Sequence, residues 1–199
     1  MTKKEFKEKL LYCIFNMNTG YNKRYVVNAA GQKIYYNCGY NWGNYTTWDC
    51  WNWLKTILWG WQPGWSVGSF LYAPGKNGVW DWNGHELIEW CKDVSEDFKN
   101  IPDLDMLITP KEDHVGIYIG ERTWNGYYFN VAECTPKTDY MIGGCLLSYV
   151  DEQGRRFNHK GGMQVGSWGK HGTIPILEDD IEFTVVYEDE DLIIGKAKK

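Results

Sequence analysis

Apolar residues recur at helical spacing in three parts of the chain. Within residues 2–16, one stripe is formed by Phe6, Leu10, Leu11, Ile14 and Phe15. After Cys50, a second stripe continues at Trp53, Leu54, Ile57, Leu58 and Trp61. This helix is predicted to begin at Asp49 and to end at Gly60, with Pro63-Gly64 just beyond it. A third helix, predicted over residues 85–99, carries Leu87, Ile88, Cys91, Val94 and Phe98 inward.

Strand-like patterns dominate the second half of the chain. The predicted strands cover residues 104–108, 114–120, 127–134 and 181–187, with a short earlier one at 24–27. Asn125-Gly126 predicts a tight hairpin turn. The rest of the segment 17–48 shows no clear periodicity. Because helices come first and antiparallel strands follow, the sequence predicts an α+β domain.

The length of 199 residues suits a single domain with a substantial core. We predict that residues 1–187 form this domain and that residues 188–199 form a charged tail or linker. The formal net charge is −5, without a cluster of Lys or Arg. This balance argues against nucleic acid or an anionic membrane surface as the main partner.

The first ten residues are charged where a secretory signal needs an apolar core, and no segment reaches membrane-spanning length. We therefore expect cytoplasmic synthesis without a signal peptide, no membrane partner and six reduced cysteines. The chain has no CxxC pair, and its four histidines lack metal-ligand spacing. Neither a metal nor another cofactor is expected.

Cys50 stands at the start of the second predicted helix and on its core-facing stripe. Asp49 before it is a favourable N-cap residue. The unpaired amides and the positive dipole end of the first turn stabilise an anionic sulfur there. We therefore expect Cys50 to ionise more easily than a free cysteine.

His114 opens a predicted strand with glycines on its own face. Alternation puts His114, Gly116, Tyr118 and Gly120 on one face and Val115, Ile117 and Ile119 on the other. The two glycines leave room for a helix to approach the histidine face. If the helix that starts at Cys50 packs there, a Cys–His pair forms for nucleophilic catalysis. Taken singly, each residue also has a purely structural interpretation.

A third polar residue on the next strand would orient the imidazole. Asn130 and Glu133 are the two candidates. With Asn125-Gly126 as the centre of a tight turn, Trp124 pairs with Tyr127 and Tyr118 lies opposite Glu133. Glu133 then shares the face of His114, and a one-residue slip would substitute Asn130.

Twelve tryptophans and fourteen tyrosines are the main compositional oddity. Many lie in predicted loops: Tyr40, Trp42, Tyr45, Trp48, Trp51, Trp59, Trp61, Trp65, Trp80 and Trp82. Exposed rings would stack on sugars or line a cleft for a polymer, whereas buried rings would close the core. The sequence leaves both interpretations open.

The order of several motifs resembles that of the NlpC-type cysteine peptidases, which cut bacterial cell-wall peptides. These motifs are Tyr40-Asn41-Trp42-Gly43, Asp49-Cys50, Leu104-Asp105-Met106-Leu107, His114-Val115-Gly116-Ile117-Tyr118-Ile119-Gly120 and Val131-Ala132-Glu133-Cys134-Thr135-Pro136. The resemblance covers roughly residues 36–136. It implies a papain-like α+β fold, in which N-terminal helices pack on a central antiparallel sheet and the catalytic cysteine starts a helix.

The resemblance also implies roles for single residues. Cys50 would be the nucleophile, His114 the base and Glu133 the residue that orients the imidazole. Tyr40 would lie beside the substrate carbonyl, and backbone amides at the helix start would stabilise the oxyanion. Asp49 would help to hold a free substrate amine.

The chain departs from the family pattern at two positions. Ser-Gly usually follows Asp-Cys, whereas this chain has Trp51-Asn52. In several relatives that serine helps the aspartate to hold the free substrate amine. Trp51 is assigned to substrate binding at this position, and the specificity for a free amine stays open. The glycine usually found before the strand aspartate is Leu104.

The resemblance implies a peptidoglycan hydrolase that cleaves a cell-wall amide bond, as an endopeptidase or an N-acetylmuramoyl-L-alanine amidase, through a thioester. A monomer is favoured, and the sequence leaves the oligomeric state open. With no export signal, it is similar to bacteriophage endolysins, which reach the wall after the membrane is breached. Two alternatives stay open: a non-catalytic, tryptophan-rich module that binds cell wall or glycan, and a cysteine acyltransferase on the same scaffold.

Overall fold

The computed structural model describes residues 1–21, 25–27, 30, 33–35, 39–42, 45–63, 65, 75–124, 126–158, 160, 162–180, 183–189 and 192–197. For the strands between residues 25 and 42, for residues 45 and 124 and for those beyond 182, the description covers the backbone only.

Three α-helices lie within the described residues, and each begins at a side-chain cap. They are α1 (Lys3–Phe15), capped by Thr2, α2 (Cys50–Leu58), capped by Asp49, and α3 (Gly84–Trp90), capped by Asn83. The first two confirm the predicted helices 2–16 and 49–60. Gly60, just after α2, has a φ of 99°, a left-handed conformation that favours glycine.

A large antiparallel sheet accounts for most of the strands. Its order is β12-β11-β10-β9-β8-β7-β13-β6, and every neighbouring pair is antiparallel. The strands are β6 (Lys92–Ser95), β7 (Met106–Ile108), β8 (Val115–Trp124), β9 (Tyr127–Thr135), β10 (Gly144–Val150), β11 (Arg155–Phe157), β12 (Gln164–Ser167) and β13 (Lys170–Thr173). The protein is therefore α+β, as predicted.

Further strands occupy the segment in which the sequence showed little periodicity. β1 (Asn18–Tyr21), β5 (Tyr45–Trp48) and β4 (Gly39–Trp42) form a small sheet in that order, with β1 parallel to β5. β2 (Tyr25–Val27), which matches the short predicted strand, pairs with β3 (Lys33–Tyr35). β5 leads directly through Asp49 into α2, so the small sheet fixes where the helix begins.

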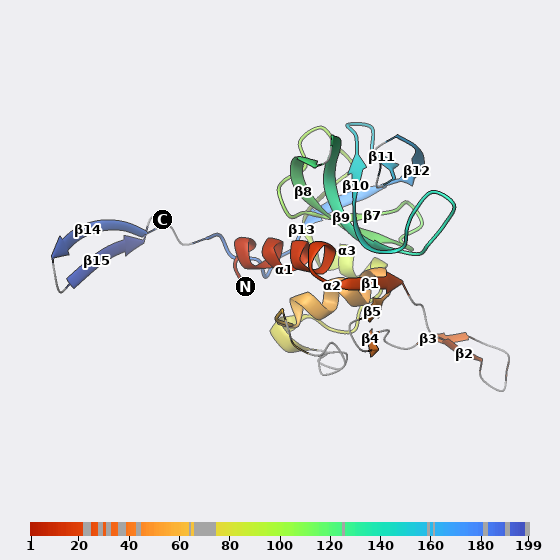
Figure 1. Ribbon diagram of the computed structural model, residues 1–199, viewed down its shortest axis with the longest axis horizontal. Coiled ribbons are helices and arrows are strands. Elements are labelled where there is room, and N and C mark those ends of the chain that lie inside the picture. The colour runs from red at the N-terminus through yellow and green to blue at the C-terminus, as the bar shows by residue number, and fades with distance from the viewer. Residues whose placement is uncertain are drawn as a thin grey trace.

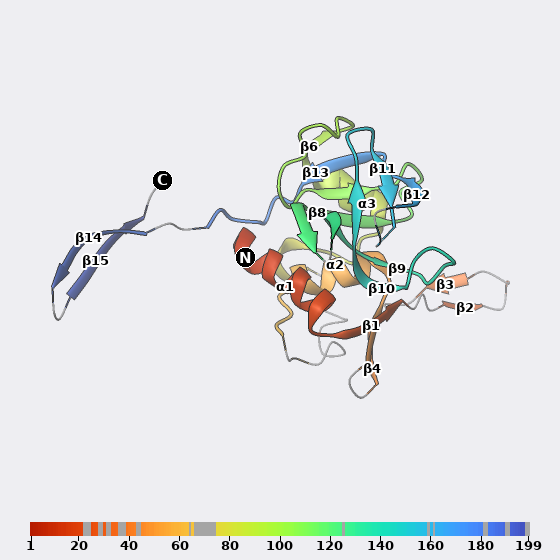
Figure 2. The same cartoon turned by 45° about the horizontal axis from the view of Figure 1, so that its top comes forward.

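The chain ends in a strand pair. β14 (Phe183–Asp189) is antiparallel to β15 (Leu192–Ala197), and both views show this pair standing apart from the rest of the molecule (Figures 1 and 2). The predicted strand 181–187 corresponds to β14. The boundary predicted at residue 188 falls inside that strand, because the acidic residues after Tyr187 continue the pairing.

The core lies mainly between the helices and one face of the large sheet, with α1 and α2 on the same side of it (Figure 1). The buried sheet residues on that side include Val115, Ile117, Ile119, Ala132 and Cys134. A smaller apolar cluster on the other face consists of Phe98, Leu107, Val131, Val150 and Trp168. Burying side chains on both faces makes the central strands nearly continuous in apolar residues.

Most described tryptophans serve the core. Trp48, Trp53, Trp59 and Trp61 have no exposed surface, whereas Trp65 and Trp80 are more than half exposed. For the four buried rings, the interpretation as core residues is therefore the better one, because a ring without exposed surface cannot stack on a sugar.

The predicted third helix, 85–99, is wrong beyond residue 90. The chain turns extended at Cys91 and continues as β6, which pairs with β13. Cys91 and Phe98 are buried as predicted, but Val94 is 46% exposed. Hydrogen bonds to a strand almost eighty residues later outweigh the local helical spacing, because the sheet edge supplies partners for the backbone.

Among the described residues, no helix is both long and apolar enough to cross a bilayer.

Candidate active site

Cys50 is the first residue of α2 and has no exposed surface. The Asp49 side chain caps the helix: its Oδ1 accepts from the Asn52 backbone N–H at 2.8 Å and its Oδ2 from Asn52 Nδ2 at 2.8 Å. These bonds hold the first turn rigidly, with the positive end of the helix dipole at the sulfur.

His114 immediately precedes β8 and links Cys50 to Glu133. Its imidazole lies close enough to the Cys50 side chain for that group to raise the pKa of the ring. On the other side of the ring, Nε2 lies 2.5 Å from Glu133 Oε2. Since Nε2 faces the carboxylate, Nδ1 is the nitrogen left for the thiol. The structure thus brings the three predicted site residues together, with His114 between Cys50 and Glu133.

The route by which Cys50 and His114 meet differs from the predicted one. We expected α2 to pack on the histidine face, but it packs on the face of Val115, Ile117 and Ile119. The two side chains meet because each stands at the start of its element, where the helix end lies beside the sheet end. The space at Gly116 is used by the Trp168 ring, since a Cβ there would lie 2.9 Å from it.

The predicted register of β8 and β9 is also wrong, although the predicted face is right. The turn pairs Trp124 with Tyr127 as expected, but Glu133 lies opposite Gly116 instead of Tyr118. An irregularity between Tyr118 and Arg122 shifts the register by two residues, and Gly120 within it has a φ of 72°. A shift of two preserves the alternation, so Glu133 still shares the face of His114.

Asn130, the other candidate, has a structural role. Its Nδ2 donates to the Val150 carbonyl at 2.7 Å, and its Oδ1 accepts from the Val150 backbone N–H at 2.7 Å. The amide therefore bridges β9 and β10 instead of reaching the imidazole.

Arg156 and Trp168 surround the His–Glu pair, and the sequence analysis missed both. Arg156 donates to both oxygens of Glu133, through Nε to Oε1 at 3.1 Å and through Nη2 to Oε2, and Nη2 also donates to Thr135. Trp168 stacks on His114 with ring centroids 5.6 Å apart, and the Arg156 guanidinium lies 5.4 Å from a Trp168 ring centroid. No local pattern in the sequence marks either residue, because Arg156 comes from β11 and Trp168 from the link between β12 and β13, both far along the chain.

These contacts shift the pKa values of both charged partners. Burial by itself lowers the pKa of His114, but the charge and hydrogen bond of Cys50, followed by those of Glu133, raise it to about 9. Burial by itself raises the pKa of Glu133, whereas the Arg156 charge and the contacts with His114 lower it to about 2. Near neutral pH the arrangement therefore holds an imidazolium between two acidic groups.

A cleft of about 590 Å³ opens beside these residues. It is lined by Tyr21, Asp113, His114, Thr135, Pro136, Thr138, Tyr140, Met141, Arg156, Gln164 and Val165. The Cys50 sulfur lies 4.0 Å from the carbonyl oxygen of Asp113, which lines the cleft, and close enough to Tyr21, another lining residue, to raise the pKa of its hydroxyl. A substrate in the cleft would thus approach the thiol past Tyr21 and His114.

A tyrosine that the sequence analysis did not single out, Tyr21 of β1, lies near Cys50 and lines the cleft. Burial first, and then the nearby Cys50 and Asp49 charges, raise the pKa of Tyr21, so its hydroxyl stays protonated. Tyr40 was expected beside the substrate carbonyl. Its backbone pairs with Thr47 in the small sheet, but its side chain lies outside the described residues.

The other two expected substrate-binding residues have structural contacts. Both Asp49 oxygens are engaged by Asn52, and the Asp49 side chain is almost completely buried. Trp51 is half-buried, and its ring lies close to Gly84 at the start of α3. Neither is among the residues that line the cleft.

Two further histidines are held by carboxylates. His171 Nδ1 lies 2.7 Å from Asp105 Oδ2 and its Nε2 2.9 Å from the Asp97 carbonyl oxygen, so both ring nitrogens are engaged in structural contacts. His85 lies 2.6 Å from Glu112 on the surface. His159 falls outside the described residues.

Cys13, Cys50, Cys91, Cys134 and Cys145 are free and buried, and Cys38 lies outside the described residues. No cluster of three His, Cys, Asp or Glu side chains suited to a metal ion occurs in the part of the chain that is described. Comparisons with protein-family models, curated proteins and solved structures find no match to this chain.

Proposed function

We propose that the protein is a cysteine hydrolase of papain-like architecture that cleaves an amide bond of bacterial peptidoglycan. The observation that carries this proposal is the line from Cys50 through His114 to Glu133 beside an open cleft. A thiol at a helix start, a base within reach of it and an acceptor behind the base are the parts that thiol-dependent acyl transfer needs.

In the proposed first step, the Cys50 thiolate attacks the carbonyl carbon of the scissile amide. The oxyanion forms at the start of α2, where the Cys50 backbone N–H and the helix dipole would stabilise it. The C–N bond then breaks, and the imidazolium of His114 gives its proton to the departing amine. Cys50 is left as a thioester.

In the second step, His114 accepts a proton from water as the water attacks the thioester carbonyl. Collapse of this second tetrahedral intermediate breaks the C–S bond, releases a carboxylic acid and regenerates the Cys50 thiolate and the imidazolium. Glu133 keeps the ring oriented in both steps, and Arg156 holds Glu133 ionised.

The substrate class rests on the resemblance to NlpC-type peptidases. One departure from that family has a physical explanation that supports the likeness. Leu104, at the position of the usual glycine, has a φ of 69°. This left-handed conformation is the one that favours glycine, so the backbone there follows the course for which a glycine is suited.

The test is release of soluble fragments from purified cell walls, with mass spectrometry of defined muropeptides to identify the bond. Cys50→Ala should abolish release while its circular dichroism spectrum stays unchanged. Cys91→Ala is the matched control, since it removes another buried thiol, and it should retain activity. Full activity of Cys50→Ala would refute the proposal.

The same spectra distinguish hydrolysis from acyl transfer. With an added amine acceptor, a hydrolase releases mainly the free acid, whereas an acyltransferase yields mainly the amide of that acceptor. Predominant transfer would overturn the hydrolytic part of the proposal.

A further inference from the structure

A second pocket, of about 500 Å³, lies at the far end of the β8–β9 hairpin. It is lined by Glu121, Gly126, Tyr127, Tyr128, Phe129, Tyr149 and Lys160. Its lining shares no residue with that of the catalytic cleft. Its size falls in the range of roughly 300–1,000 Å³ that is common for small-ligand sites.

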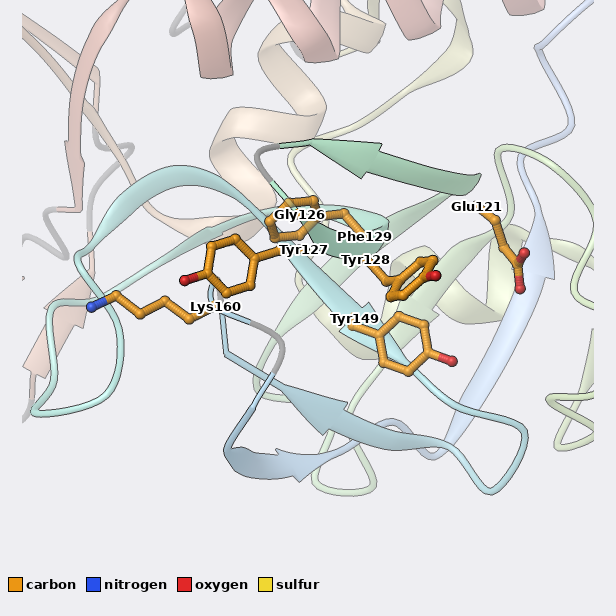
Figure 3. A pocket seen from close by; sticks show the side chains of 7 residues that line it. All are labelled: Glu121, Gly126, Tyr127, Tyr128, Phe129, Tyr149 and Lys160. Atoms are coloured by element: carbon orange, nitrogen blue, oxygen red, sulfur yellow. The ribbon is translucent and has the colours of Figure 1, made fainter.

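Aromatic side chains dominate this pocket, and two of them are strongly exposed. Tyr128 is 69% and Tyr127 45% exposed, while Phe129 is buried, with its ring centroid 6.4 Å from that of Tyr127. Figure 3 shows the rings of Tyr128 and Tyr149 close together, with their hydroxyls pointing outward. Large rings left in water at a concave surface are typical of a binding site, because such rings are otherwise buried.

The polar groups of the pocket carry opposite charges. In Figure 3, Glu121 lies at one end and Lys160 at the other, on the side of Tyr127. Together with the tyrosine hydroxyls, they offer hydrogen-bond donors and acceptors without a net charge. This balance suits a neutral ligand better than a phosphate or a polyanion.

The backbone irregularity in β8 brings Glu121 to this pocket. Glu121 lies between Tyr118 and Arg122, where the register shifts, and irregularities of this kind re-aim side chains. Burial first, and then the negative charge of Glu121, raise the pKa of the Tyr149 hydroxyl. Tyr149 therefore remains a hydrogen-bond donor at neutral pH.

We infer that this pocket binds the sugar chain of the wall polymer, taking one or more uncharged N-acetylated pyranose rings. The apolar faces of such rings stack on tyrosines, and their hydroxyl and acetamide groups match the carboxylate, ammonium and phenol groups. The choice of this sugar class rests on the proposed function. The site would hold the glycan while a peptide branch reaches the catalytic cleft.

The two sites share one structural element. The β11–β12 hairpin carries Lys160 in its connecting loop, and Arg156, Gln164 and Val165 on its strands line the catalytic cleft. A polymer bound at the pocket would therefore be held on the same hairpin that forms a wall of the cleft.

The experiment is an NMR titration of the full chain carrying Cys50→Ala, with a β-1,4-linked oligomer of N-acetylglucosamine as the probe. We expect saturable shifts of residues around Tyr128. Adding Tyr128→Ala should raise the Kd about tenfold, which corresponds to about 1.4 kcal/mol. Tyr128→Phe should stay within about threefold, because it keeps the ring that stacks.

Trp80→Ala is the matched control, since Trp80 is 58% exposed but lies outside the pocket. It should leave the Kd unchanged. The inference is overturned by absence of saturable binding, by an equal effect of Tyr128→Ala and Trp80→Ala, or by a sugar-free stem peptide that occupies the Tyr128 site instead.

Failure here is distinguishable from failure of the proposed hydrolase. Cleavage is measured on soluble muropeptide without a glycan strand, and sugar binding on a variant without the nucleophile. Cleavage without sugar binding overturns only the pocket assignment. Sugar binding without cleavage refutes the hydrolase and supports the glycan site.

Discussion

Arg156 is predicted to be the main support of the buried carboxylate behind His114. Glu133 has no exposed surface, and the Arg156 side chain is only 11% exposed. Replacement by methionine keeps much of the volume and removes the charge. The consequence is a buried carboxylate that has lost its strongest favourable partner.

The size of the effect follows from the pKa of Glu133. Lowering it from 4.5 to about 2 corresponds to roughly 3 kcal/mol of stability at neutral pH. Because the folded pKa is the lower one, this contribution is present above pH 4.5 and is lost as the pH falls through 2. Breaking a buried ion pair by removing one partner typically costs about 3–5 kcal/mol, so we expect a loss of about 3 kcal/mol for Arg156→Met.

The assay is urea unfolding at pH 7, followed by fluorescence of the buried tryptophans. Arg155→Met is the matched control: Arg155 is 51% exposed and pairs with Asp151, so it should lose less than about 1 kcal/mol. Combining Arg156→Met with Glu133→Gln should recover part of the loss, because the unpaired charge is then gone.

Two outcomes would refute this reasoning. One is an equal loss in Arg156→Met and Arg155→Met, which would mean that burial of the pair does not matter. The other is simple additivity in the double variant, which would mean that Arg156 and Glu133 are not coupled. As a further check, the acid-unfolding midpoint should move to higher pH in Arg156→Met, because Glu133 then takes up its proton more easily.

Three further predictions concern the same site. The raised pKa of His114 stabilises the fold fully below about pH 6.5, and this contribution is lost as the pH rises through 9. The difference in unfolding free energy between wild type and His114→Gln should therefore shrink from pH 6 to pH 10, and a constant difference would contradict this prediction. Tyr21→Ala should speed iodoacetamide labelling of Cys50 several-fold, because Tyr21 lies near the buried thiol and lines the cleft. An unchanged rate would show that other groups control access of the reagent to Cys50. Gly116→Ala should lower stability by about 1–3 kcal/mol in thermal unfolding, since the added Cβ would meet the Trp168 ring that stacks on His114. Gly162→Ala, with open space around its Cβ, should change stability by less than about 0.5 kcal/mol, and equal effects of the two substitutions would disprove the close contact.

Local patterns predicted the elements that carry the site. The periodicity after Cys50 and the cap at Asp49 located α2, and Asn125-Gly126 located the β8–β9 turn. These features depend on neighbours within a few residues, which a sequence displays directly. The same kind of pattern failed at residues 91–99, where pairing with β13 replaced a helix with a strand.

The predicted side of Glu133 was right although the predicted partner was wrong. A tight turn fixes the pairing at Trp124 and Tyr127, and the irregularity after Tyr118 displaces it by two residues further along. Only an odd displacement would have moved Glu133 to the other face. The size of the register displacement depends on how the two strands pack, which the turn sequence does not specify.

The sequence by itself determined that a cysteine starts an amphipathic helix, that a histidine opens a strand and that a carboxylate follows on the next strand, because each is a short-range pattern. Only the tertiary structure decided which groups complete the site. Tyr21 from β1, Arg156 from β11 and Trp168 beside β13 gather there through sheet order and packing. Such contacts join residues as far apart in the sequence as His114 and Trp168, and they exist only once the sheets and helices have packed together.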